Sequence, residues 1–212
     1  MNYFFDLDNT LLKHNIYTTD FWIKNIGAKT AKEFGIKITK NKWKKIFEGE
    51  IHINKLIKNQ NIETKKFWSK LNKADLEIRK KLLKNPNDIE LFEDVQVIKN
   101  LSGKKAIISN TAQESIIFCL KHFGIHNYFD IIIGNNGKNV NKLKPFPDSI
   151  LKAIKILGIK KNDVIFVGDE IRDLKAGKAA GVKTIIINRN GDKIDFGDLK
   201  PDRIIRSLKE LL

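Results

Sequence analysis

The sequence predicts an α/β fold in which a doubly wound parallel sheet carries an all-helical insertion. Apolar, strand-like runs alternate with helical patterns from about residue 103 to the C-terminus. A similar apolar run, YFFDL at 3–7, lies alone near the N-terminus. Between about residues 14 and 90 the periodicity is helical throughout. Strands that alternate with helices imply right-handed crossovers and a parallel sheet covered on both faces.

The first half of the chain begins with the strand at 3–7, followed by a polar turn at Asn9 and Thr10. Thr18 or Thr19 can cap a helix that runs to about Phe34 and is closed by Gly35. Further helices are expected at about 39–48, 51–58, 62–71 and 74–84, with Pro86 ending the series. Asp88 can cap a helix that presents one apolar face, formed by Ile89, Phe92, Val95 and Ile98.

The second half is expected to alternate regularly. Strands are predicted at 105–109, 129–133, 164–167 and 183–187, and helices at 112–123, 147–157, 170–180 and about 201–212. We therefore predict a core domain formed by 1–13 and 91–212 and a helical domain at 14–90. The first strand is too short to be stable alone, so we expect it to join the later sheet. The helical domain would then lie above the carboxyl ends of the strands, where ligands bind in such sheets.

Composition narrows the class of protein. A chain of 212 residues with 42% hydrophobic content can bury a substantial core. No apolar stretch approaches the roughly 20 residues that a membrane span needs, and MNYFFDLDN lacks the layout of a signal peptide. Cys119 is the only cysteine, so we expect no internal disulfide, a buried thiol and a reducing, cytoplasmic location.

The net charge of +15 raises the question of a nucleic-acid partner. Only five of the 40 basic residues are arginines, and the lysines are spread through the whole chain. Compositional bias explains this pattern at least as well as a binding surface does. We therefore do not expect nucleic acid as the partner, although the charge should attract anionic substrates.

Four aspartates end two of the predicted strands. Asp6 and Asp8 lie in FFDLDNTLL, and Asp169 and Asp173 lie in IFVGDEIRD. If the two strands lie side by side, these carboxylates converge, and such crowding of like charges requires a cation or a shared proton. The cluster predicts a magnesium site suited to phosphate chemistry. One carboxylate of the first pair can attack phosphorus, and the other can protonate the leaving oxygen.

The ordered motifs of the chain resemble those of the haloacid dehalogenase superfamily of phosphohydrolases, in its phosphoglycolate-phosphatase-like branch. The first motif matches DLDNT. The resemblance implies a Rossmann-like core, Asp6 as the nucleophile and Asp8 as the general acid/base, with the Asp8 backbone carbonyl as a magnesium ligand. Members that dehalogenate lack the second aspartate, so its presence favours phosphoryl transfer.

The second and third motifs match IISNT and KLKPFPD. Ser109 and the Asn110 backbone N–H would bind a phosphoryl oxygen, and Lys144 would neutralise the nucleophile and the phosphate. On local sequence alone, Ser109 or Thr111 could be an ordinary helix cap, and a lysine could be solvated. The position of each in the ordered set favours the functional interpretation.

The fourth motif matches VGDEIRD. Asp169 would coordinate Mg²⁺ directly, and Asp173 would bind a metal-bound water or orient Lys144. Thr10 and Glu170 are candidates for groups that surround the metal ligands. Many relatives carry Ser or Thr where Glu170 lies, so this glutamate either adds negative charge beside the metal or points outward.

The helical insertion resembles the cap of this branch, which closes over the site and selects the substrate. Candidate substrate-facing side chains are Tyr17, Trp22, Lys24, Trp43, Lys44, His52 and Trp68. The four histidines, His14, His52, His122 and His126, show no zinc-ligand spacing, and we expect surface or structural roles for them.

The expected function is a magnesium-dependent phosphatase that acts on a small phosphorylated metabolite through an aspartyl-phosphate, as a monomer or homodimer. Two alternatives remain open. A sugar-phosphate mutase would use the same residues, and a phosphatase of nucleotides or nucleic-acid ends would use the basic surface. The substrate itself, whether phosphoglycolate, a sugar phosphate, pyrophosphate or a nucleoside monophosphate, is not determined by the sequence.

Overall fold

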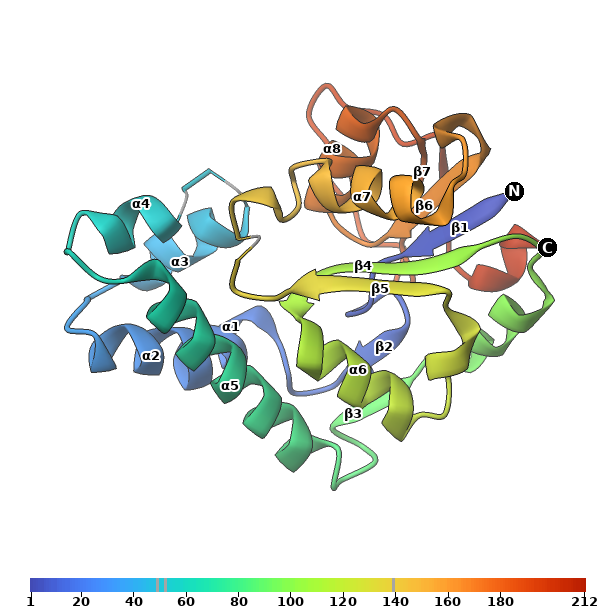
Figure 1. Cartoon of the computed structure of the whole chain (residues 1–212). Helices are drawn as coiled ribbons and strands as arrows, with labels where there is room; N and C mark the ends of the chain where they lie inside the picture. The colour runs from blue at the N-terminus through green and yellow to red at the C-terminus, as the bar shows by residue number, and fades with distance from the viewer. Residues whose placement is uncertain (49, 52, 139) are drawn as a thin grey trace.

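The computed structural model describes residues 1–48, 50–51, 53–138 and 140–212. Its main sheet has six strands in the order β5-β4-β1-β6-β7-β8, and all neighbouring strands are parallel (Figure 1). The strands are β1 (Asn2–Phe5), β4 (Lys105–Ala112), β5 (Ile131–Asn135), β6 (Val164–Gly168), β7 (Lys183–Ile187) and β8 (Arg203–Ile205). This arrangement confirms the predicted α/β, Rossmann-like class with a parallel, doubly wound sheet.

The N-terminal strand β1 lies in the middle of this sheet. Phe5 is paired with Ile107 of β4 on one side and with Val167 of β6 on the other. The carboxyl ends of these three strands therefore lie at one edge of the sheet. Because parallel strands of similar register end together, residues far apart in sequence meet at that edge.

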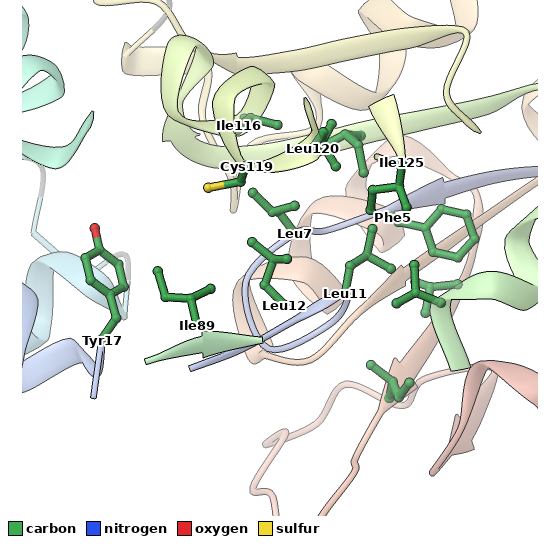
Figure 2. Packing of buried hydrophobic residues seen from close by; sticks show 14 of the residues in the cluster. Phe5, Leu7, Leu11, Leu12, Tyr17, Ile89, Ile116, Cys119, Leu120 and Ile125 are labelled. Carbon is green, nitrogen blue, oxygen red and sulfur yellow. The ribbon is translucent and has the colours of Figure 1, made fainter. Parts of the chain in front are cut away.

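Helices cover both faces of the sheet (Figure 1). The helix α6 (Gln113–His122) covers one face, and α7 (Asp148–Leu157) and α8 (Ile171–Ala180) cover the other. Consecutive residues of β1 alternate between the two layers, with Phe5 in one apolar cluster and Phe4 in the other. Figure 2 shows the α6 side, where the thiol-bearing Cys119 packs beside Leu7; its side chain is fully buried, as predicted.

The insertion between the first strand and the remaining core contains five α-helices within its described residues. They are α1 (Thr19–Trp22), α2 (Ala28–Glu33), α3 (Lys40–Phe47), α4 (Ile53–Lys58) and α5 (Thr64–Leu82), with a π-helical turn at Ile23–Gly27 joining α1 to α2. Thr18 caps α1 by accepting a hydrogen bond from the Phe21 N–H, as expected. The two helices predicted at 62–71 and 74–84 are one continuous helix, α5, because no glycine or proline interrupts them.

Two short strands join the insertion to the core. β2 (Leu12–His14) pairs in antiparallel fashion with β3 (Ile89–Leu91), so the chain enters and leaves the insertion side by side. The predicted Asp88-capped helix is therefore wrong at its start: Ile89 lies in β3, and only a 3-10 helix follows, at Glu93–Asn100. The pairing of this segment with β2 outweighs the helical spacing of Ile89, Phe92, Val95 and Ile98.

The predicted C-terminal helix is also wrong. Residues Arg203–Ile205 form β8, the edge strand, and a short 3-10 helix follows at Leu208–Leu211. Ile204 and Ile205 pair with Ile186 and Ile187 of β7. The β-branched pair suits a strand, and the open edge of the sheet supplies its hydrogen bonds.

Among the described residues, no helix combines the length and apolar character needed to cross a bilayer. The division into a core domain (1–13 and 91–212) and a helical domain (14–90) stays a prediction. Its boundaries would fall at the two-stranded sheet formed by β2 and β3.

Candidate active site

Three carboxylates meet where β1 and β6 end. Asp6 follows β1, Asp169 follows β6, and Asp173 lies on the first turn of α8. One oxygen from each lies within 4.8 Å of the others. Gly168 permits this arrangement, because a Cβ at that position would lie 2.3 Å from Asp173 Cγ. The structure thus brings together three of the four predicted aspartates.

Lys144 lies within this cluster. Its Nζ is 2.8 Å from Asp6 Oδ1 and 2.5 Å from Asp173 Oδ1, and its side chain is buried. The second Asp173 oxygen accepts from the backbone N–H groups of Asp169 and Glu170, each at 3.1 Å. Both Asp173 oxygens are thus engaged, so this residue orients Lys144 and the loop after β6. Asp6 Oδ1 has the ammonium nearby but no aligned hydrogen-bond donor.

The protonation of the cluster reflects burial and mutual repulsion. Burial, opposed by Lys144, raises the pKa of Asp6 to about 6. Burial and then the charge of Glu170 raise the pKa of Asp169 well above its ordinary value. Burial would lower the pKa of Lys144, but Asp173 and Asp6 raise it. A hard divalent cation would relieve this crowding, and carboxylate oxygens are the ligands that Mg²⁺ prefers. The donor set therefore fits magnesium.

Asp8 points away from the three-carboxylate cluster and is held by other groups. Arg79 of α5 donates two hydrogen bonds to it, at 2.8 and 2.7 Å, and the Thr111 hydroxyl donates a third at 2.7 Å. His14 Nε2 lies 2.7 Å from Asp8 Oδ1. Burial would raise the pKa of Asp8, but Arg79 and His14 outweigh it and hold the pKa well below its ordinary value. The Asp8 carboxylate is therefore engaged by these groups and does not join the three-carboxylate cluster.

Arg79 is itself buried in a small polar network inside the insertion. Its guanidinium is 1% exposed, and its Nε donates to Asp75 at 3.2 Å. Tyr17 donates its hydroxyl proton to the same Asp75, and its ring lies 4.5 Å from the guanidinium carbon. One arginine thus links the loop after β1 to the longest helix of the insertion.

The second predicted motif lies on β4, next to β1. Ser109 is buried and accepts a hydrogen bond from the Thr111 N–H at 3.2 Å. The Asn110 side chain makes two hydrogen bonds with the Lys144 backbone, both at 2.8 Å. The sequence suggested only the backbone of Asn110 as a ligand for phosphate. Its side chain has a further role, because it fixes the segment that carries Lys144.

Thr10 and Glu170, the two candidates for groups around the metal ligands, make different contacts. Thr10 is fully buried and donates to Asp169 Oδ1 at 3.3 Å. Glu170 pairs with Arg172, whose guanidinium lies 5.4 Å from the Phe47 ring of α3. Glu170 therefore contributes negative charge near Asp169 and also anchors an arginine that reaches the insertion.

A cavity of about 440 Å³ opens beside these residues and extends into the insertion. Tyr17, Trp22, Trp43 and Trp68 line it, in agreement with their selection as substrate-facing candidates. Lys24 and Lys44 are exposed and do not line it. His52 lies outside the described residues.

Sequence reasoning missed Arg79 and His14. For His14 the sequence predicts a surface or structural role but not a contact with Asp8, beside which its buried ring lies. A signal for Arg79 did exist. In a chain with five arginines among 40 basic residues, an arginine marks a place where a planar, multidentate donor is needed. Arg79, Arg172 and Arg189 all make such contacts near the site.

Comparison with known proteins agrees with this geometry. The family model described as haloacid dehalogenase-like hydrolase matches residues 3–187. The chain is 35% identical over 125 residues to the pyrophosphatase PpaX of Halalkalibacterium halodurans, covering 58% of this chain and 56% of that protein. It is 30% identical over 122 residues to the phosphoglycolate phosphatase of Aquifex aeolicus, covering 55% of this chain and 56% of that protein.

A solved structure also resembles the whole chain. The HAD phosphatase from Thermococcus onnurineus is 25% identical with a TM-score of 0.63, covering 99% of this chain and 95% of that chain. The matches to the two curated relatives, in contrast, span only about half the length of each relative. The family model nevertheless covers most of the sheet and all four motifs. The chain therefore belongs to the haloacid dehalogenase-like hydrolase family.

Proposed function

We propose that this protein is a magnesium-dependent phosphatase that hydrolyses a small phosphorylated metabolite through an aspartyl-phosphate on Asp6. The observation that carries the proposal is the position of Asp6. Its carboxylate lies beside Lys144 and two further carboxylates, at a cavity that also exposes Asp8. This combination offers a nucleophile, a fixed cation and a proton-transfer group within one site.

The residues divide the reaction into two steps. The Asp6 carboxylate attacks phosphorus, the P–O bond to the leaving group breaks, and Asp8 protonates the leaving oxygen. Asp8 then takes a proton from water, which attacks the aspartyl-phosphate and releases inorganic phosphate. Lys144, Ser109 and the Asn110 N–H would hold the phosphoryl oxygens during both steps.

The contacts of Asp8 favour one of its two tasks. The pairing with Arg79 and His14 stabilises the carboxylate, which is the form that accepts a proton from water. To act as an acid, Asp8 must carry a proton against the attraction of Arg79. We therefore expect the first step to respond strongly to the basicity of the leaving oxygen.

Magnesium would be held by Asp6, Asp169 and the backbone carbonyl of Asp8, with Asp173 and Thr10 orienting the groups around it. When bound, the ion would supply positive charge that neutralises the phosphoryl oxygens. Lys144 alone cannot balance the three clustered carboxylates, so the chain's own charges support this assignment.

The names of the relatives support a small phosphorylated substrate, since one is a pyrophosphatase and another a phosphoglycolate phosphatase. We propose the same substrate class here, for an enzyme that acts as a monomer or homodimer in the cytoplasm. The free thiol of Cys119 fits a reducing compartment.

The experiment is phosphate release over a panel of phosphorylated metabolites with Mg²⁺. Asp6→Asn should abolish turnover, whereas Asp20→Asn, an exposed aspartate on α1, should retain it. Chelation should abolish activity and leave the fold largely intact, and Ca²⁺ should substitute poorly because it prefers more ligands and looser geometry. Normal magnesium-dependent turnover by Asp6→Asn would contradict the proposal.

Two further measurements, of the product formed from sugar phosphates and of nucleic-acid binding, separate the two alternatives. A mutase would release isomerised sugar phosphate instead of free phosphate. A phosphatase of nucleic-acid ends would bind nucleic acid with an affinity that falls steeply with salt concentration.

A further inference from the structure

One wall of the cavity beside Asp6 differs in chemistry from the carboxylate cluster at the strand ends. All three tryptophans of the chain line it, namely Trp22, Trp43 and Trp68. Phe47, Ile46 and Ile51 complete the apolar part of the wall. A phosphate bound at Asp6 would place its leaving group in the space that this wall borders.

The aromatic part of the wall is closely packed. The Trp22 ring lies 5.5 Å from the Trp43 ring and 5.1 Å from the Phe47 ring, in edge-to-face arrangements. Gly27 makes room for this packing, because a Cβ there would lie 2.6 Å from the Trp22 ring. Trp68 is fixed by a hydrogen bond from its Nε1 to Asn54 Oδ1 at 2.7 Å. Such a wall is preorganised to contact an apolar or aromatic group.

The cations around the cavity are already paired. Among the described lining residues, Lys144 pairs with Asp6, Arg79 with Asp8, and Arg172 with Glu170. His14 also contacts Asp8. The same lining contains five carboxylates against three permanent cations, and these carboxylates are Asp6, Asp8, Asp75, Asp169 and Glu170. The proposed Mg²⁺ would be held by Asp6 and Asp169, so a second anionic group on the substrate would still meet no unpaired cation among these residues.

From these observations we infer that the enzyme prefers phosphomonoesters with an uncharged, largely apolar leaving group, aromatic groups included. Substrates that carry a second anionic group, such as phosphoglycolate and pyrophosphate, should be poor by comparison. This inference rests on the proposed phosphatase function. It distinguishes the chain from what the names of its relatives state, and it names the aromatic wall as the part that determines specificity.

The first test compares benzyl phosphate with phosphoglycolate in the wild-type protein with Mg²⁺. In both substrates the leaving oxygen becomes a primary hydroxyl, so the chemical step is similar and the difference reports the leaving-group site. Contact of one phenyl ring with the wall should raise kcat/KM by about tenfold or more. Phe47→Ala should remove most of that advantage, whereas Ile156→Ala, an exposed residue of α7, should not change it.

A second variant tests the charge argument. Glu170→Gln frees Arg172 from its only ion-pair partner among the described residues. The ratio of kcat/KM for phosphoglycolate to that for benzyl phosphate should rise several-fold. If Glu170→Gln changes the rate of the chemical step equally for both substrates, that change cancels in the ratio.

Binding can be measured without turnover. Because every tryptophan lines the cavity, intrinsic fluorescence of the Asp6→Asn protein reports its occupancy directly. Tighter binding of benzyl phosphate than of phosphoglycolate or pyrophosphate, with a fluorescence change, supports the inference. Equal or tighter binding of phosphoglycolate or pyrophosphate overturns it and leaves the phosphatase function intact. Absence of phosphate release from every substrate overturns the proposed function, while the fluorescence titration still decides the leaving-group preference.

Discussion

Replacing Arg79 with methionine removes the group that joins the loop after β1 to helix α5. The methionine fills similar space but removes the guanidinium from two carboxylates, which keep only their contacts with Thr111 and His14 at Asp8 and with Tyr17 at Asp75. Asp8 loses two hydrogen bonds, at 2.8 and 2.7 Å, and Asp75 loses one at 3.2 Å. Asp75 is only 5% exposed, whereas Asp8 is 24% exposed and can recover part of its solvation.

The burial of these groups sets the size of the effect. Removing one partner of a buried ion pair costs ~3–5 kcal/mol, because the remaining charge stays desolvated. Since Asp8 is partly solvated, we expect the lower end of that range, about 3 kcal/mol of unfolding free energy. Arg79→Lys should recover only part of this loss, since an ammonium cannot span both carboxylates in the geometry of a guanidinium.

Urea unfolding followed by circular dichroism measures this difference. Lys40→Met is the matched control, because the Lys40–Asp20 pair has the same 2.7 Å separation but lies on the surface. Its unfolding midpoint should be unchanged. A loss below about 1 kcal/mol for Arg79→Met, the range of exposed pairs, would refute the idea that burial gives this contact its energy.

Three further predictions concern the groups around the site. Gly168→Ala should lower kcat more than it lowers the unfolding free energy, because the new Cβ would displace Asp173 and with it Lys144. An unchanged kcat in a normally folded variant would contradict this prediction. Burial raises the pKa of Asp6 to about 6, so without Mg²⁺ the melting temperature should fall as the pH rises from 3.8 through 6. Saturating Mg²⁺ should make the melting temperature depend less on pH in this range. A profile that does not respond to magnesium would count against the metal site. Burial would raise the pKa of Asp94, but hydrogen bonds, of which the one from Arg189 is the strongest influence, lower it. The ionised Asp94 therefore stabilises the folded protein above pH 3.8, and this stabilisation is lost as the pH falls further. Asp94→Asn should remove this acid dependence in thermal unfolding.

Much of the core could be predicted because its signals are local. The strands β1, β4, β6 and β7 are short apolar runs bounded by turn residues, and the helices between them show regular amphipathic spacing. The motif residues Asp6 and Asp169 directly follow such strands, and Ser109 lies within β4, so parallel packing brings these three together. Lys144 lies in a turn beyond β5 and is positioned by the hydrogen bonds of the Asn110 side chain to its backbone.

The errors lie where partners distant in the sequence decide the structure. Ile204 and Ile205 read equally well as part of a helix, and only the open edge beside β7 makes them a strand. Ile89 likewise belongs to β3 because Leu12 and His14 offer a pairing partner 75 or more residues earlier in the chain. The local propensity of a segment contains no information about whether such a distant pairing partner exists.

The α/β class, the order of the motifs and the aspartate pairs at the strand ends can be recognised in the sequence alone, because periodicity and strand boundaries depend on neighbouring residues. The contact between Arg79 and Asp8, 71 positions apart, and the position of three tryptophans around one cavity follow from the tertiary structure. Such contacts depend on how the insertion packs against the strand ends. Burial then strengthens the charged contacts, since a charge removed from water interacts far more strongly with its neighbours.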